Sequence, residues 1–347
     1  MRRIIVLLCF WVVAVANLQA QVQRPKPVGP AKVDTSKNDQ VLVDFADLFE
    51  YIQGRDSTLQ KLLGNVELRQ DSVFMYCDSA IIINETDVIA MGNVIIQQGD
   101  SISVFADSLA YQGKQRIADL FGNVVLLHGK NQKLYTEVLR YDLGEKLATY
   151  ETGALLTNDT TQLTSRRGYY YLKTDDVYFR DSVQVVSPDF ELKSDTLKFN
   201  TRRQKATFLG PTLITEEISK IYCEGGYYKV RENEALFSKN PQYLKTETQT
   251  KATADSIRYD GDRKEVALMG NARFEEPGKL ATADVLRYDE VRDISYLEGH
   301  AVYVEDKQEI RADTLTYDQK KEIYTTRGRS FVSDPPQLIE ADRLDYD

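Results

Sequence analysis

The chain has 347 residues, of which 28% are charged and 42% hydrophobic, and its formal net charge at pH 7 is −9. This balance is typical of a folded protein and excludes both a disordered chain and one embedded in a membrane along its whole length. An acidic chain is also a poor partner for nucleic acid, whose phosphates are bound by basic surfaces.

The first 20 residues have the pattern of a secretory signal peptide. Arg2 and Arg3 precede an apolar stretch over residues 4–16, and Ala20 stands at a suitable cleavage point. A membrane anchor is the alternative, but the apolar stretch is short for a bilayer span. We therefore predict an exported protein with residues 1–20 removed. The exact cleavage site stays open, because Leu18 is large for its position.

Residues 21–40 are rich in proline and polar residues and predict a flexible leader. The segment 41–53 could form an amphipathic helix. Because its Ala46-Asp47 pair aligns with the repeat described next, we predict β-strand there instead.

From residue 41 onward the chain repeats a short box, Ala-Asp-x-Leu-x-Tyr, at intervals of 28 to 31 residues. The last position of the box forms a column that comprises Tyr51, Ile82, Tyr111, Tyr141, Tyr171, Phe199, Tyr228, Tyr259, Tyr288, Tyr317 and Tyr346. Self-similarity at a fixed period identifies a tandem repeat. We predict an all-β array of about ten units of ~29 residues.

A glycine recurs about 14 residues before the acid of most boxes, often as Gly-Asn-Val. The column comprises Gly64, Gly92, Gly122, Gly153, Gly210, Gly270, Gly299 and Gly328, with Ser182 and Pro241 as exceptions. Glycine between strand residues is typical of a bulge or sharp bend. Each unit is predicted to hold three short β segments: one after the glycine, one carrying the box, and an apolar third such as 264–268. Helix is expected to be scarce.

The box breaks the alternation of a regular strand. Ile310 and Ala312 share one face, Leu315 and Tyr317 share the other, and all four are apolar. Either both faces are covered, or a bulge near Asp313 switches the facing. We favour the bulge, with the acid pointing outward or accepting backbone amides. A ladder of calcium ligands is the alternative, but the glycine-rich loops of calcium-binding rolls are missing, so no metal is predicted.

Neither the cysteines nor the histidines indicate a reactive site. Cys77 and Cys223 replace the small residue before the acid, five repeats apart. Stacked strands advance about 4.8 Å each, which puts the two thiols beyond disulfide reach, so both are predicted to be free and buried. His128 and His300 stand at different phases of the repeat, and His300 replaces the Asn after the glycine. With no nucleophile elbow, phosphate loop or Cys-x-x-Cys pair, we predict no enzyme and no cofactor.

Apolar columns follow the whole array. If the two faces close, these columns form a core; if the faces splay along one seam, they line a groove able to shelter acyl chains, and periodicity does not choose between the two. The groove candidates are Val94, Ile96, Leu109, Tyr111, Val124, Leu126, Leu139 and Tyr141.

The signal peptide and the repeated Gly-Asn-Val and Ala-Asp-x-Leu-x-Tyr-Asp boxes resemble the OstA/LptA family of lipopolysaccharide transport proteins, over residues 41–347. The resemblance implies an elongated antiparallel β-jellyroll, slightly open, whose inner face carries lipid A tails. It implies lipopolysaccharide, other OstA/LptA-like jellyrolls stacked edge strand on edge strand, and membrane transport complexes at either end as partners. The implied location is the periplasm, with outer-membrane association, and the family has no catalytic residues.

The array departs from the family in its length and in its degenerate middle units, residues 153–240. We expect one array over 41–347 or two OstA-like halves, about 41–165 and 166–347, with the last unit incomplete. Two functions remain open: a lipid carrier or bridge in lipopolysaccharide transport, or a structural or surface β-solenoid with a closed core that binds polysaccharide or protein.

Overall fold

The computed structural model describes residues 39–129, 132–157 and 161–346. The predicted signal peptide and nearly all of the predicted leader lie outside these ranges. Within them the chain forms 28 β-strands, paired antiparallel, and no helix. The predicted all-β, antiparallel jellyroll-like fold is therefore confirmed. The described ranges also contain no helix that is long and apolar enough to cross a membrane.

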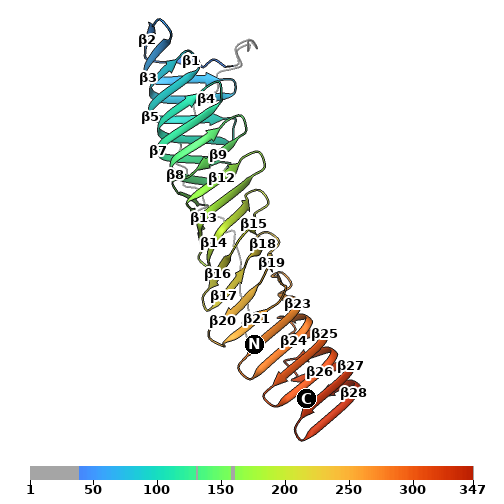
Figure 1. Ribbon diagram of the computed structural model, residues 1–347. Helices are drawn as coiled ribbons and strands as arrows, with labels where there is room; N and C mark the ends of the chain where they lie inside the picture. Colours follow the sequence, from blue (N-terminus) through green and yellow to red (C-terminus); the bar gives the residue numbers. More distant parts are fainter. Residues whose placement is uncertain (1–38, 130–131, 158–160, 347) are drawn as a thin grey trace. The chain divides into compact units, whose positions relative to one another are not determined.

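The chain divides into two compact units, with the boundary between Ala148 and Thr149 inside strand β9 (Leu147–Tyr150). In each unit, the long strands pair antiparallel with the strands before and after them in sequence (Figure 1). The strands of the N-terminal unit are β1 (Leu42–Phe45), β2 (Leu48–Gln53), β3 (Thr58–Gln70), β4 (Val73–Ile83), β5 (Asp87–Gln98), β6 (Ile102–Gln112), β7 (Ile117–His128) and β8 (Gln132–Asp142).

The C-terminal unit is also built of antiparallel strands. Its strands are β10 (Ala154–Thr157), β11 (Gln162–Ser165), β12 (Arg167–Tyr171), β13 (Asp176–Val186), β14 (Glu191–Asn200), β15 (Lys205–Phe208), β16 (Thr212–Glu216), β17 (Ser219–Cys223), β18 (Gly225–Lys229), β19 (Glu234–Ser238), β20 (Gln242–Lys245), β21 (Thr250–Thr253), β22 (Ser256–Asp260), β23 (Glu265–Glu276), β24 (Lys279–Asp289), β25 (Ile294–Glu305), β26 (Gln308–Asp318), β27 (Ile323–Asp334) and β28 (Gln337–Tyr346).

Each well-formed repeat consists of two long strands, and the prediction of three short segments is wrong in this respect. In β5 the glycine lies in the middle of one strand, so the apolar segment before Gly92 and the segment after it are continuous. The glycine bends the strand without ending it, because the ladder resumes on both sides after a register shift. The segment 41–53 is strand, as predicted, and forms β1 and β2.

The bend keeps both halves of a strand facing the interior. In β6 the residues Ile102, Val104 and Ala106 are buried, alternation then breaks at Asp107, and Leu109 and Tyr111 are buried as well. The same break occurs in β26 between Ala312 and Leu315. The predicted switch of facing at the acid is thus confirmed, and it allows one strand to contribute apolar residues to two packed half-sheets.

These two half-sheets are called here the tyrosine ladder, made of half-strands that carry the box tyrosines, and the post-glycine ladder, made of half-strands that follow the glycine. In the middle of the C-terminal unit the bends become breaks, so each half is a separate short strand. There the tyrosine ladder continues through β15, β18, β19 and β22, and the post-glycine ladder through β16, β17, β20 and β21.

An acid–asparagine pair holds each regular bend. Gly92 and Asn93 have positive φ values of 77° and 46°, which glycine and asparagine tolerate best. A side chain at Gly92 would put its Cβ 2.4 Å from Oδ2 of Asp78, so only glycine fits. Asn93 donates from Nδ2 to that same oxygen at 2.9 Å. The box acid therefore points outward, as expected, and accepts a side-chain amide instead of backbone amides.

Substitutions in these columns keep the arrangement. His300 has a φ of 49°, and its Nδ1 lies 3.0 Å from Oδ2 of Asp284, so it replaces the asparagine as predicted. Cys77 and Cys223 are buried and free, and burial raises the pKa of each thiol to about 11. Within the described ranges, no group of three or more acidic, histidine or cysteine side chains could hold a metal ion.

Candidate functional site

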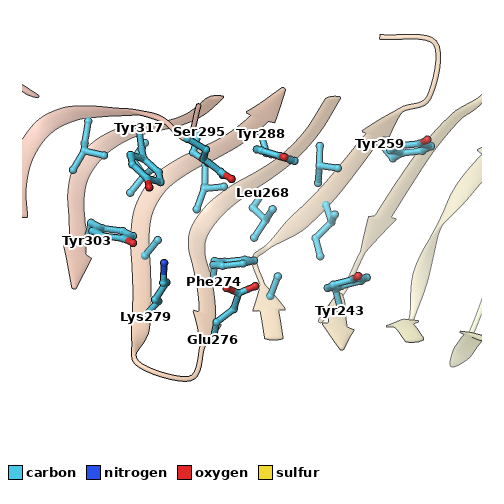
Figure 2. A pocket seen from close by; sticks show the side chains of 18 of the residues that line it. Tyr243, Tyr259, Leu268, Phe274, Glu276, Lys279, Tyr288, Ser295, Tyr303 and Tyr317 are labelled. Carbon is cyan, nitrogen blue, oxygen red and sulfur yellow. The ribbon is translucent and has the colours of Figure 1, made fainter. Parts of the chain in front are cut away.

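A partly open cavity of about 290 Å³ lies between the two ladders of the C-terminal unit. In Figure 2, Tyr259, Tyr288, Ser295 and Tyr317 lie along one side of it, and Tyr243, Phe274, Glu276, Lys279 and Tyr303 lie along the other. The first group belongs to the tyrosine ladder and the second to the post-glycine ladder. The repeat therefore builds the cavity from its two inward columns.

The lining is largely apolar because the bend turns both halves of each strand inward. Among the lining residues are Leu268, Leu286, Leu297 and Leu315, each at most 6% exposed. Ala252 and Ala281 supply small side chains where neighbouring repeats carry larger ones, and Phe274 and Tyr243 supply rings. Such a concave apolar surface suits an alkyl chain or another apolar ligand.

Three tyrosines bound the cavity on the side of β26 and β27. The ring of Tyr303 lies 6.1 Å from that of Tyr317 and 5.2 Å from that of Tyr324. Oε2 of Glu305 accepts hydrogen bonds from the hydroxyls of Tyr303 at 2.8 Å and Tyr324 at 3.2 Å. The bond from Tyr324 crosses between the two ladders and ties them together at this boundary.

Glu305 also forms an ion pair with Lys279, whose Nζ lies 2.7 Å from Oε1. Burial opposes ionisation of this carboxyl most strongly, but the hydrogen bonds from Lys279 and the tyrosines outweigh it and hold its pKa below the usual range. The carboxylate is thus charged and fully engaged. Lys279 is a cavity-lining cation whose nearest acid is already in contact with it.

Two other polar groups, Gln319 in the lining and Glu290 within electrostatic reach of the lining residue Tyr243, are less well satisfied. Oε1 of Glu290 and Nε2 of Gln319 are buried and have no hydrogen-bond partner within the described residues. Burial raises the pKa of Glu290 to about 7. Glu216, Glu276 and Glu290 all act on the phenol of Tyr243, whose pKa is raised chiefly by burial. Three acidic side chains therefore act on Tyr243, although the lining of the cavity is largely apolar.

Comparison with known families accounts for most of the array. The model described as "OstA-like protein" matches residues 38–195, and the model described as "LptA/(LptD N-terminal domain) LPS transport protein" matches residues 162–294. The two matches overlap and together run without a gap from residue 38 to residue 294. The chain belongs to the OstA/LptA-like family.

The chain is also similar to solved structures, and no curated protein matches the chain. One of these structures is that of LptH from Pseudomonas aeruginosa, described as the LptA homologous periplasmic component of the conserved lipopolysaccharide transport device. It shares 22% identity over 30% of this chain and 79% of LptH, with a TM-score of 0.28, too low to support an argument. The matched families are those of transport proteins and not of enzymes.

The eight groove candidates of this OstA/LptA-like chain lie in the N-terminal unit, on β5 to β8, and each is at most 2% exposed. Val94, Ile96, Val124 and Leu126 face inward from the post-glycine ladder, and Leu109, Tyr111, Leu139 and Tyr141 face inward from the tyrosine ladder. The structure brings them together as a buried interior, and their role as a lipid groove stays a prediction.

Sequence reasoning did not single out the cavity of the C-terminal unit. Phe274 occupies the same place after its glycine as Ile96, and Tyr317 the same place in its box as Tyr111. The apolar columns of the sequence therefore could not show that the cavity lies in the C-terminal unit and not in the N-terminal one. The sequence does contain one difference between the units, two residues after Ile96 and Phe274. Glutamine ends β3 and β5, whereas glutamate ends β23 and β25.

Proposed function

We propose that this protein is an exported, periplasmic lipid carrier in lipopolysaccharide transport to the outer membrane. In this proposal residues 1–20 direct export, residues 21–40 form a leader, and residues 41–347 form the carrier. Family membership and the apolar cavity between the ladders support it, and the cavity is the observation that carries it.

The ligand part with which the cavity is complementary is an acyl chain. Burial of alkyl groups contributes about 0.8 kcal/mol per methylene, so ten buried methylenes would contribute roughly 8 kcal/mol before the cost of ordering the chain. The cavity has room for only part of a large lipid, so the sugar head group would stay outside, next to the polar rim formed by Glu276, Lys279 and Gln319.

The proposal includes partners of the same fold. Within the described residues, β1 and β2 pair only with β3, which leaves the backbone of these strands available on their other side. This edge exposes large apolar side chains, namely Leu42, Phe45, Leu48, Phe49 and Tyr51. An exposed edge strand of this kind invites pairing with a further strand. We propose that another OstA/LptA-like jellyroll binds there and extends a bridge towards membrane complexes.

The alternative is a structural or surface protein with a closed core that binds polysaccharide or protein. The buried interior of the N-terminal unit fits that alternative as well, but the cavity of the C-terminal unit does not. The two functions therefore predict different behaviour of the cavity residues toward lipid.

Photocrosslinking with purified lipopolysaccharide distinguishes the lipid carrier from the closed-core alternative. A photoreactive amino acid would replace Phe274 in the cavity, or Phe121, which is 42% exposed on the outer face of β7, as the matched control. Crosslinks to lipid A at position 274 and none at position 121 support the carrier. No crosslink at position 274, together with purified protein free of lipid A by mass spectrometry, supports the closed-core alternative.

A further inference from the structure

One inward position differs in chemistry between the two units. It is the sixth residue after the bulge glycine, at the end of the post-glycine half-strand, and it is called here the sixth position. In the N-terminal unit it is held by Gln70, Gln98 and His128, and in the last repeats of the C-terminal unit by Glu276, Glu305 and Asp334. Most other inward positions are apolar in both units, with buried Thr326 and Ser330 among the exceptions.

In the N-terminal unit the two glutamines tie the ladders together. Gln70 accepts a hydrogen bond from the hydroxyl of Tyr111, and its Nε2 donates to the carbonyl of Gly113 at 3.2 Å. Gln98 repeats both contacts one unit later, accepting from Tyr141 at 2.5 Å and donating to the carbonyl of Leu143 at 3.1 Å. Each glutamine on the post-glycine ladder thus bridges to a tyrosine and a turn of the tyrosine ladder.

These contacts seal the seam between the ladders. Gln70 and Tyr111 are each 2% exposed, and Arg116 and Asp71 form an ion pair between the same two turns. A carboxamide can perform this task because it accepts with its oxygen and donates with its nitrogen at the same time. A carboxylate only accepts, so it would leave the turn carbonyl unpaired and place a charge beside it.

In the C-terminal unit the equivalent bridge is missing at Glu276, whereas Glu305 accepts a hydrogen bond from Tyr324 of the tyrosine ladder. Tyr317 follows Glu276 by 41 residues, the same interval as from Gln70 to Tyr111, yet no hydrogen bond joins Tyr317 to Glu276 within the described residues. Glu276 instead accepts from Oγ1 of Thr250 at 2.9 Å, and Tyr317 stacks on Tyr324. Figure 2 shows Tyr317 and Glu276 on opposite sides of the cavity. The cavity lies where the bridge is absent.

We propose that the sixth position decides which unit takes the ligand. Glutamine at this position seals the N-terminal unit against acyl chains, and Glu276, which forms no bond to Tyr317, leaves the seam beside it free to admit them. The inference rests on the proposed lipid-carrier function and adds that acyl binding is confined to the C-terminal unit, so that the N-terminal unit serves the proposed bridge by binding a partner at its edge and not by holding lipid. In this inference four residues have a role beyond packing, which is to close the seam between the ladders. They are Gln70, Gln98, Tyr111 and Tyr141.

The test uses the full chain and a long-chain fatty acid that carries a diazirine at its methyl end. After irradiation, labelled peptides are mapped by mass spectrometry. The wild-type chain is expected to be labelled on β19 to β26 and not on β3 to β8. The double variant Tyr111→Phe with Tyr141→Phe loses both bridging hydroxyls, which is expected to raise labelling of β3 to β8 by about thirtyfold.

Two further variants complete the test. Tyr135→Phe removes a hydroxyl from an exposed tyrosine of β8 and is expected to change nothing. Glu276→Gln restores the carboxamide opposite Tyr317 and is expected to lower labelling of the cavity, which decides the matter if the double variant does not fold.

The outcomes separate the two proposals. Labelling of both units in the wild-type chain overturns the inference about the seam while the carrier function stands. So does a folded double variant whose β3 to β8 stay unlabelled. The absence of labelling in every variant overturns the carrier function itself.

Discussion

Tyr317 stacks on Tyr324 across neighbouring strands of the tyrosine ladder, with ring centroids 4.2 Å apart and ring planes 9° apart. Tyr317 occupies the box position whose counterpart Tyr111 bridges the ladders in the N-terminal unit. The ring stack is thus what this tyrosine does in a repeat where the bridge is not formed. Tyr317 lines the cavity, so the stack lies at its boundary on the side of β27.

The stack is expected to contribute coupling energy beyond burial. In a double-mutant cycle with Tyr317→Leu and Tyr324→Leu, the two changes should be less destabilising together than the sum of the singles, by about 1 kcal/mol. Urea unfolding monitored by circular dichroism measures each corner of the cycle. Strict additivity, within about 0.3 kcal/mol, would show that the two rings do not act as a pair.

Filling the cavity is expected to weaken lipid binding without unfolding the protein. Ala281→Leu adds three carbon atoms to a lining residue that is 5% exposed, so it should reduce fatty-acid affinity by about tenfold while changing the free energy of unfolding by about 1 kcal/mol. Titration of a fluorescent fatty acid measures the affinity. The matched control is Ala267→Leu on the outer face of β23, which should bind as the wild type does. Equal binding by Ala281→Leu would place the ligand elsewhere.

The destabilisation caused by replacing a glycine of positive φ is expected to depend on how close neighbouring atoms lie to the added side chain. Gly92→Ala puts a methyl group at a φ of 77° and against the carboxylate of Asp78, and should cost about 3 kcal/mol. Gly99→Ala is the control, because its φ is 61° but no atom lies within 4 Å of the added carbon, so it should cost about 1 kcal/mol. Chemical denaturation compares them. Equal costs would mean that the contact with Asp78 is not a constraint.

Much of this architecture follows from the sequence because its cause is local. Gly92 and Asn93 adopt a backbone that few other residues tolerate, and the acid opposite them needs a donor, so the spacing of these residues predicts the bend and the switch of facing. The sequence does not predict the number of strands per repeat, because a glycine that bends a strand and a glycine that ends one have the same local sequence pattern. Pairing on both sides of Gly92 decides between them, and that pairing is a long-range property.

The site could be predicted only in part. The sequence predicts that Val94 and Tyr111 face the interior, because an apolar column indicates which side chains of a strand point inward. Whether that interior is sealed depends on Gln70 and Gly113, which are 43 residues apart and meet only because the ladders fold onto each other. The difference between glutamine and glutamate at the sixth position is visible in the sequence. Its consequence can be recognised only when the turn that contacts this position in the folded chain is known.

Stability is expected to fall as Glu290 ionises. Burial raises its folded-state pKa to about 7, above its ordinary value of 4.5. The folded chain therefore holds the proton more tightly than the unfolded chain. The resulting stabilisation is complete below the unfolded pKa and is lost as the pH rises toward 7.

The variant Glu290→Gln removes this titration. Relative to the wild type it should gain about 1–2 kcal/mol in free energy of unfolding above pH 7 and little at pH 4. Denaturant unfolding over this pH range measures the difference, with Glu232→Gln in an exposed turn as the control. A pH-independent difference between Glu290→Gln and the wild type would contradict the raised pKa.

The central claim is that an acyl chain occupies the space between the two ladders of the C-terminal unit. Nuclear Overhauser contacts from isotope-labelled leucine methyl groups to the acyl chains of bound lipopolysaccharide measure this directly. We predict contacts to Leu268, Leu286 and Leu297, and none to Leu109, Leu120 and Leu139 in the sealed unit. Bound lipopolysaccharide that shows no contact with the cavity leucines would contradict the claim.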